Sequence, residues 1–355
     1  MSRRATIAGV GLIGGSVGMA LREQGWHVSG VDADPAQCAR GIDLGALDAT
    51  GWDAAAEVTF VAVPVGRVAA VAAEALEAAP AGFVTDVGST KAAIVEAIDD
   101  PRFVGGHPMA GSEQEGVEGA DAAMFRGANW VLTPGGVTAD DAFALVRAVV
   151  RSLGAEVVTL APERHDALVA LVSHVPHLTA ASLVGLADRR SEEHSAVLRL
   201  AAGGFRDMTR IAAGHPGIWP DICAENRDAI TGALDDLIAA LGDVRRVVAE
   251  GDGATLLARL EAARAARVSL PTGAPPPSEL LEVRVPVLDR KGEIAAVAAL
   301  ATELDVNIYD LEIAHSAEGD RGVMLLFVEA GLADRLVAGL EGLGYRPSTS
   351  PLVPG

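Results

Sequence analysis

The sequence predicts an α/β protein in three parts. A doubly wound, mostly parallel sheet comes first, then an all-α domain, then a small α+β domain. Short apolar runs alternate with Ala-rich helical segments up to residue 162. Apolar and polar residues alternate with the period of two that is typical of strands only after residue 279. The length of 355 residues agrees, because domains usually hold about 150 residues.

The first predicted domain spans residues 1–162. A short strand at 6–8 leads into a glycine-rich turn at 9–15 and a helix at 12–24. Further strands are expected at 27–31, 58–63, 83–86, 103–105, 130–133 and 156–159, with helices at 65–79 and 140–153. This alternation predicts parallel strands joined by crossover helices.

The second domain, residues 163–268, is predicted to be entirely helical because Ala and Leu dominate and no alternating period is seen. Its segment 167–187 contains no Asp, Glu, Lys or Arg and is long enough to cross a bilayer. However, Ser, His, Thr and Pro176 lie along it. We therefore expect a buried, kinked core helix and no membrane partner.

A stiff linker at 269–278, with four prolines in ten residues, separates the third domain, residues 279–350. Strands are expected at 281–287, 306–314 and 323–329, helices at 293–304 and 332–343, and a last strand near Tyr345. This order predicts a ferredoxin-like fold.

Composition excludes several classes of function. The formal net charge of −20 makes nucleic acid an improbable main partner, since the surface repels phosphates. Cys38 and Cys223 are too few and too far apart for a disulfide framework or a zinc pattern. The N-terminus lacks the layout of a signal peptide, so a cytoplasmic location is expected.

Residues 9–14, GVGLIG, fit the G-x-G-x-x-G pattern of a dinucleotide site. Gly9, Gly11 and Gly14 permit a tight turn and close approach of a pyrophosphate, while Leu12 and Ile13 begin a helix whose N–H groups point at it. Asp32, at the end of the second strand, is placed to bind the ribose diol of NAD and to repel the extra phosphate of NADP. The alternative is a glycine turn that binds nothing.

Three further stretches follow strands of the predicted sheet, where ligands of such sheets bind. Val63 and Pro64 lie at the C-terminal end of one strand, and Ser89 lies just after the next. Ser89 either faces nicotinamide or substrate, or caps the helix starting near residue 91. His107 is expected in a flexible loop after the strand at 103–105. It either accepts a hydroxyl proton during hydride transfer or only fastens the loop by hydrogen bonds.

The helical domain adds two candidate groups. His174 and His177 lie three residues apart, but no third ligand has matching spacing, so no metal is predicted. Arg206 and Arg210 follow Gly203 and Gly204 in a very acidic chain. Either Arg binds a substrate carboxylate or forms surface ion pairs.

Taken together, the stretches GVGLIGGS, DVGSTK, FVGGHPMAGSE, VSHVPH, GGFRDMTRIA and HPGIW resemble the prephenate dehydrogenase family, which includes arogenate and cyclohexadienyl dehydrogenases. The resemblance covers the first two domains, a Rossmann-type domain and a helical dimerisation domain. It implies NAD-dependent oxidative decarboxylation of prephenate to 4-hydroxyphenylpyruvate in tyrosine biosynthesis, by a homodimer. The third domain is similar to ACT domains, which implies an amino-acid effector such as tyrosine.

Residue roles follow from the same resemblance. His107 matches the catalytic base, and Ser89 matches the residue that orients it and the hydroxyl. Arg210 matches the residue that binds the ring carboxylate, and His177 a residue near the substrate side chain. Positions lining or gating the pocket are matched by Ser112, Glu113, Gly203 and Trp219.

Three other functions remain open. Arogenate dehydrogenase differs only in whether the side chain of the substrate is an amino acid or a keto acid. A 3-hydroxyacid dehydrogenase would typically use a Lys of the helical domain, and residues 163–267 contain none. A non-catalytic sensor of NAD and amino acids is disfavoured by the presence of His107 and Arg210.

Overall fold

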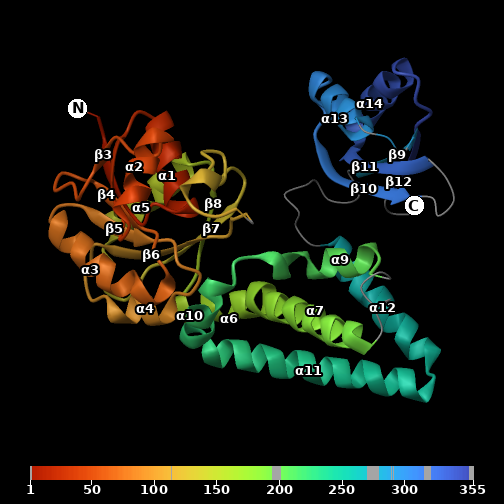
Figure 1. Ribbon diagram of the computed structural model, residues 1–355, viewed down its shortest axis with the longest axis horizontal. Helices are drawn as coiled ribbons and strands as arrows, with labels where there is room; N and C mark the ends of the chain where they lie inside the picture. Colours follow the sequence, from red (N-terminus) through yellow and green to blue (C-terminus); the bar gives the residue numbers. More distant parts are fainter. Residues whose placement is uncertain are drawn as a thin grey trace. The chain divides into compact units, whose positions relative to one another are not determined.

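An eight-stranded sheet organises the first 160 residues, in the order β3-β2-β1-β4-β5-β6-β7-β8 (Figure 1). All neighbouring strands are parallel except β6 and β7. The strands are β1 (Arg4–Ala8), β2 (His27–Val31), β3 (Ala49–Thr50), β4 (Val58–Val61), β5 (Phe83–Asp86), β6 (Phe103–Pro108), β7 (Asn129–Thr133) and β8 (Glu156–Thr159). The doubly wound parallel sheet is therefore confirmed.

The helices of this region are α1 (Leu12–Glu23), α2 (Pro35–Asp43), α3 (Val68–Ala78), α4 (Ala92–Ala97) and α5 (Asp140–Ser152), with short 3-10 turns η1 (Val65–Arg67) and η2 (Val117–Gly119). A core of aliphatic side chains around Phe60, Phe125 and Trp130 fills the space between sheet and helices. The computed structural model describes residues 2–112, 114–193, 201–269, 280–288, 290, 292–315 and 321–351.

The prediction for His107 was wrong in one respect. The strand does not end at Gly105 but continues to Pro108, because the antiparallel partner β7 pairs His107 with Val131 and Pro108 with Trp130. His107 therefore lies on a strand, which holds its backbone more rigidly than a loop would. An isolated sequence does not reveal this pairing, since two glycines precede the histidine.

The second region is helical, as predicted. It comprises α6 (Pro162–Val169), a π turn η3 (Ala170–His174), α7 (Val175–Glu193), α9 (Gly203–Thr209), η4 (Arg210–Ala213), η5 (Pro216–Ile218), α10 (Trp219–Glu225), α11 (Arg227–Glu250) and α12 (Gly253–Val268). The expected kink is the π turn, which widens the helix just before Pro176, a residue with no N–H to donate.

The expectation that this segment is a buried core helix is wrong for the single chain. Leu171 and Val172 are 58% and 64% exposed. A small cluster of Ala170, Ile222 and Ile230 covers only one side of the helix. By length and composition, Pro162–Arg190 could cross a membrane, which is weak evidence because core helices of soluble proteins pass the same test.

The chain divides into two compact units, Met1–Leu241 and Gly242–Gly355. The second unit contains the end of α11 and all of α12, followed by β9 (Leu280–Leu288), α13 (Glu293–Glu303), β10 (Ile308–His315), β11 (Arg321–Glu329), α14 (Ala330–Gly342) and β12 (Ser348–Pro351). Its antiparallel sheet has the order β10-β11-β9-β12, and α13 and α14 pack on an apolar core that includes Val285, Val297 and Leu336. This is the ferredoxin-like fold predicted. The linker at 269–278 lies, except for Ser269, outside the described residues.

Candidate active site

A cavity of about 670 Å³ lies at the carboxyl edge of the sheet, between the ends of β1 and β4, where the strand order reverses. Ligands of doubly wound sheets bind at this position. Five of the predicted cofactor residues line it: Gly9, Gly11, Asp32, Val63 and Pro64. Leu12 and Ile13 instead line a second cavity, described below.

The three glycines of the turn are required for different reasons. Gly9 has φ +98°, and a Cβ there would lie 2.3 Å from the Ala62 carbonyl oxygen. A Cβ at Gly14 would lie 2.0 Å from the Gly9 oxygen, so Gly14 lets α1 pack tightly on β1. A Cβ at Gly11 would meet no atom within 4 Å. Gly11 therefore keeps open space beside the N-terminus of α1, where a pyrophosphate fits.

Asp32 is held in place by the turn it faces. Its Oδ2 accepts the Val10 N–H at 2.7 Å, and its Oδ1 accepts the Asp34 N–H at 2.9 Å. Both bonds come from the backbone, so the carboxylate is fixed at the rim of the cavity with lone pairs left for a ribose diol. The open cradle at Gly11 and this carboxylate fit NAD.

The second cavity, of about 980 Å³, joins the sheet to the helical region within the first unit. The predicted residues that line it are Ser89, His107, Ser112, His177, Arg210 and Trp219, together with Leu12 and Ile13. Gly203 lies at the exposed start of α9 and does not line this cavity. Glu113 lies outside the described residues. The six predicted catalytic and substrate-binding residues that line this cavity are spread over 130 positions of the sequence, from Ser89 to Trp219.

Ser89 is not the cap of α4. The N-cap position is Lys91, without a side-chain cap. The carboxylate of Asp166, from α6, takes that role: Oδ1 accepts the Lys91 N–H and Oδ2 accepts the Ala92 N–H, both at 2.8 Å. The Ser89 hydroxyl is therefore not used as the cap of this helix, and it lines the cavity.

His107 begins a chain of side-chain contacts that the sequence did not predict. Its Nδ1 lies 2.8 Å from Nε2 of His165, and Nδ1 of His165 lies 2.8 Å from Oδ1 of Asp166. His165 and Asp166 are buried and begin the helical region. They lie 58 and 59 positions after His107, and no local pattern marks them as its partners.

A buried ion pair supports the same region from the other side. Lys91 and Asp86 are fully buried and bonded to each other. The Lys91 ammonium also donates to the Gly106 carbonyl at 2.9 Å, and Asp86 Oδ1 accepts the Gly106 N–H at 3.0 Å. Oδ2 of Asp86 accepts the Gly88 N–H at 2.8 Å. The ion pair therefore holds in place Gly106, which precedes His107, and Gly88, which precedes Ser89.

These surroundings disfavour the charged forms of His107 and His174. Burial first, and then the repulsion that the charged forms of His165, Lys91 and His174 would exert on a second positive charge, hold the pKa of His107 well below its usual value of 6.5. Burial lowers the pKa of His174 to about 4. Burial likewise disfavours the charged form of Lys91 and lowers its pKa, although Asp86 opposes this shift. A neutral His107 beside a cavity can accept a proton at neutral pH.

The two histidines of the SHVPH stretch differ in role. His174 is buried, 3.3 Å from the Asn226 amide, and Asn226 also donates to the Asp166 carbonyl at 2.9 Å. His177 stacks on Trp219, with ring centroids 3.7 Å apart and planes at 16°. No group of three His, Cys, Asp or Glu side chains that could hold a metal occurs among the described residues.

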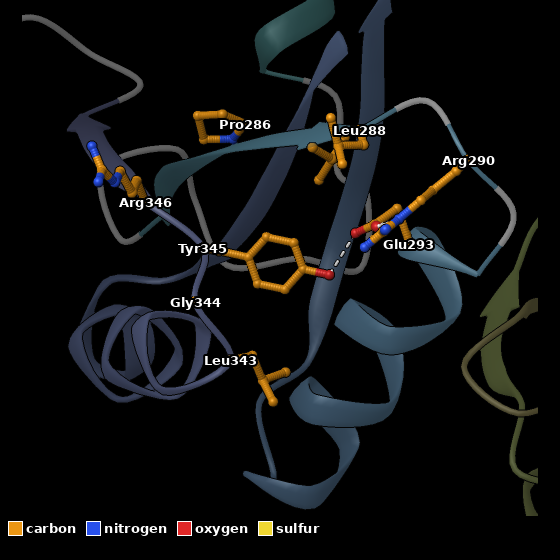
Figure 2. Close-up of a pocket in the computed structure, with 9 residues that line it drawn as sticks. Pro286, Leu288, Arg290, Glu293, Leu343, Gly344, Tyr345 and Arg346 are labelled. Atoms are coloured by element: carbon orange, nitrogen blue, oxygen red, sulfur yellow. Dashed lines mark hydrogen bonds and ion pairs between the residues drawn. The ribbon is translucent and has the colours of Figure 1, made fainter. Parts of the chain in front are cut away.

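The second unit has a pocket of its own, of about 410 Å³, beside the N-terminus of α13 (Figure 2). Tyr345 points its hydroxyl at Glu293 and donates to it at 2.6 Å, and Arg290 pairs with the same carboxylate. These two partners, Tyr345 first, lower the pKa of Glu293. Arg346 also lines the pocket, while Asp289 and Lys291 lie outside the described residues.

Comparison with known proteins places the chain in a family. Residues 17–159 match the family model "Prephenate dehydrogenase, nucleotide-binding domain", and residues 161–262 match "Prephenate dehydrogenase, dimerization domain". Prephenate dehydrogenase of Bacillus subtilis is 34% identical over 336 residues, 90% of each chain. Cyclohexadienyl dehydrogenase of Zymomonas mobilis is 32% identical and covers 76% of this chain and 97% of its own.

Among solved structures, prephenate dehydrogenase of A. aeolicus, in complex with hydroxyphenyl propionate and NAD+, superposes with a TM-score of 0.72. It is 29% identical and covers 76% of this chain and 99% of its own. With both family models matched in order and relatives above 30% identity over most of its length, the chain belongs to the prephenate dehydrogenase family.

Proposed function

We propose that this protein oxidises prephenate with NAD, releasing CO2 and forming 4-hydroxyphenylpyruvate for tyrosine biosynthesis. The observation that carries the proposal is the convergence of His107, Ser89 and Arg210 on one cavity that also reaches Leu12 and Ile13 of the nucleotide turn. Family membership and the activity named for the B. subtilis relative support it.

The chain's residues have distinct tasks in this reaction. Gly9, Gly11 and Asp32 hold NAD, which when bound accepts the hydride from the carbinol carbon of the ring. His107, neutral and on a rigid strand, takes the hydroxyl proton as the carbonyl forms. Ser89 orients that hydroxyl. The bond to the ring carboxylate then breaks and CO2 leaves. The electron pair of that bond moves through the ring to the new carbonyl oxygen, which takes back a proton, and the ring becomes aromatic.

Substrate binding falls to the helical side of the cavity. The Arg210 guanidinium forms charge-assisted hydrogen bonds to the ring carboxylate. The stacked pair of His177 and Trp219 holds the side chain of the substrate, and Ser112 lines the same cavity. By the family resemblance, Glu113 and Gly203 complete or gate this pocket.

Arogenate is the alternative substrate, and the cyclohexadienyl dehydrogenase relative supports a dual specificity. Prephenate and arogenate share the ring and both carboxylates, so His107 and Arg210 would act on either. The preference between the two substrates depends on the side chain, which carries a ketone in prephenate and an ammonium group in arogenate. A non-catalytic sensor of NAD and amino acids is the distant alternative.

The protein is proposed to act as a cytoplasmic homodimer. The match to a dimerization domain and the exposed apolar side chains of the helical region, among them Leu171, Val172 and Leu186, support an interface there. Burial of such side chains against a second copy would remove apolar surface from water.

Residues 279–350, within the second unit, are proposed to be an ACT domain that binds an amino acid, tyrosine in the first instance. The antiparallel sheet in the order β10-β11-β9-β12 supports this. Two cations, Arg290 and Arg346, line its pocket and suit a carboxylate (Figure 2). The alignment with the B. subtilis relative covers 336 residues, which exceeds the 278 that precede residue 279.

NADH formation tests these proposals. Purified protein is incubated with NAD and either prephenate or arogenate, each with and without tyrosine. Turnover of prephenate is the expected result, and preference for arogenate would move the enzyme to the alternative substrate. Absence of NADH with both would refute catalysis and leave the sensor. A chain ending at Ser269 should lose inhibition by tyrosine, and an unchanged inhibition curve would refute the effector site.

A further inference from the structure

We infer that His165 and Asp166 are positioning residues that fix the proton of His107 on Nδ1 and so leave Nε2 as the basic nitrogen. The inference rests on the proposed function only for the reaction that His107 serves. The arrangement itself is a property of the three side chains and their contacts within the first unit.

Asp166 determines the proton positions of the chain, because an ionised carboxylate can only accept hydrogen bonds. Three N–H donors surround its two oxygens: the backbone amides of Lys91 and Ala92, and the imidazole of His165. Nδ1 of His165 must therefore carry a proton. In the neutral ring, Nε2 of His165 then has a lone pair and no proton.

That lone pair determines the state of His107. The 2.8 Å contact between Nε2 of His165 and Nδ1 of His107 needs one donor, and His165 has none to offer on that side. Nδ1 of His107 is consequently protonated, and Nε2 of the neutral ring is free to accept a proton. The other tautomer would place a proton on Nε2 and make His107 a donor, which cannot serve as a base.

His165 and Asp166, which form a dyad on α6, are themselves held firmly in place. Both residues are buried, and the Asp166 carbonyl accepts the Asn226 amide at 2.9 Å. The His165 and His107 rings meet edge to face, with centroids 5.0 Å apart and planes at 75°. Because His107 lies on β6 and the dyad on α6, the contact also fixes how the helical region presents its side of the cavity to the strand.

Two variants separate positioning from packing. His165→Gln supplies an amide oxygen that can accept a hydrogen bond from Nδ1 of His107. His165→Leu removes the acceptor and fills the site with an apolar side chain. We expect kcat of His165→Leu to fall ~10–100-fold, less than the ~10²–10⁴-fold that a general base supplies. KM and the Kd for NAD should stay unchanged, and His165→Gln should recover most of the loss.

The control is the same change in a chain without the base. In a His107→Asn background, His165→Leu should cause no further loss of kcat, because a residue that acts through His107 has nothing left to position. An equal loss in both backgrounds, or no rescue by His165→Gln, would overturn the inference in favour of a packing role.

A readout independent of activity completes the test. In the full-length protein with ¹⁵N-labelled histidine, NMR should show the His107 ring, identified by its absence in His107→Asn, protonated on Nδ1 and bare on Nε2. A proton on Nε2 would refute the inference. If the wild type oxidises neither prephenate nor arogenate, the proposed function fails, while this spectrum still decides the tautomer.

Discussion

Lys91 and Asp86 form a fully buried ion pair that is bonded to Gly106, the residue before His107 on β6. The Lys91 ammonium donates to Gly106, and Asp86 accepts from both Gly106 and Gly88. Two charges and two backbone segments are therefore joined in one network. Removing either charge leaves the other without its partner in a medium where it cannot be hydrated.

We therefore expect Lys91→Met to lower the free energy of unfolding by about 3–5 kcal/mol, the usual cost of breaking a buried pair. Urea denaturation measures it. The matched control is Arg246→Met, which breaks exposed contacts with Asp243 and Glu250 and should cost less than ~1 kcal/mol. Equal losses in the two variants would show that the buried pair has no special weight.

Gly11→Ala should separate cofactor binding from folding. A Cβ at Gly11 meets no protein atom within 4 Å, so the variant is expected to melt like the wild type. The added methyl group would occupy the space beside the N-terminus of α1 and raise the Kd for NAD, measured by calorimetry. Gly9→Ala is the contrasting variant, since its φ of +98° and a 2.3 Å contact predict loss of stability. Unchanged NAD affinity in Gly11→Ala would place the pyrophosphate elsewhere.

His107→Asn is expected to bind NAD normally and to lose kcat by ~10²–10⁴-fold, the usual contribution of a general base. The side chain lines the cavity from a paired strand, so the substitution removes a proton acceptor without altering the nucleotide turn. Steady-state kinetics and NAD titration measure the two effects. Turnover at the wild-type rate would exclude His107 from the mechanism.

Arg210→Ala should act on substrate binding. Loss of a charge-assisted hydrogen bond typically costs ~1.5–3 kcal/mol, so KM is expected to rise by ~10–100-fold. Arg206→Ala is the matched control, because Arg206 is on the adjoining helix α9 and does not line the cavity. If both variants raise KM equally, the effect is one of overall charge and Arg210 has no specific role.

The pH dependence follows from the lowered pKa of His107. Because its folded pKa lies below 6.5, the neutral base persists at pH 6.5, and kcat/KM should fall only in more acidic solution. His174 gives the corresponding effect on stability. Its stabilising contribution is complete above pH 6.5 and is lost as the pH falls towards 4.

Both effects can be measured separately. A pH profile of kcat/KM reports His107, and an acid limb centred above pH 6.5 would contradict the neutral base. Urea denaturation between pH 6.5 and 4 reports His174, which is expected to contribute a loss on the order of 3 kcal/mol, to which any loss from carboxylates that titrate in the same window is added. His174→Phe should flatten that part of the stability profile.

Much of this architecture was predictable because it depends on local patterns. The strands at 27–31, 83–86 and 156–159 end where the apolar runs end, and the glycine turn lies between β1 and α1 as its spacing requires. Helix α2 was missed, although Asp34 caps it and Pro35 begins it, because its mean composition is polar. The two-residue strand β3 gives no signal at all.

The site was predictable only in part. His107, Ser89 and Arg210 were found through motifs, but Lys91, His165 and Asp166 were not. Their importance arises from contacts between distant segments, such as Lys91 with Gly106 and His165 with His107. A lysine after Gly-Ser-Thr and a His-Asp pair at a helix start look like ordinary surface residues in a sequence. Only the fold shows that they are buried.

The π turn at Ala170–His174 determines which side chains of one long helix share a face. On an uninterrupted α-helix, the twelve steps from His165 to His177 would leave them about 120° apart around the axis. The π turn takes up one additional residue, which reduces the rotation about the helix axis by about 100°. Positions 165 and 177 then lie within about 20° of each other around the axis. Helix geometry therefore puts the partner of the base and the residue stacked on Trp219 on one face of the helix. A homologue with a regular helix would need one residue fewer here to achieve the same alignment.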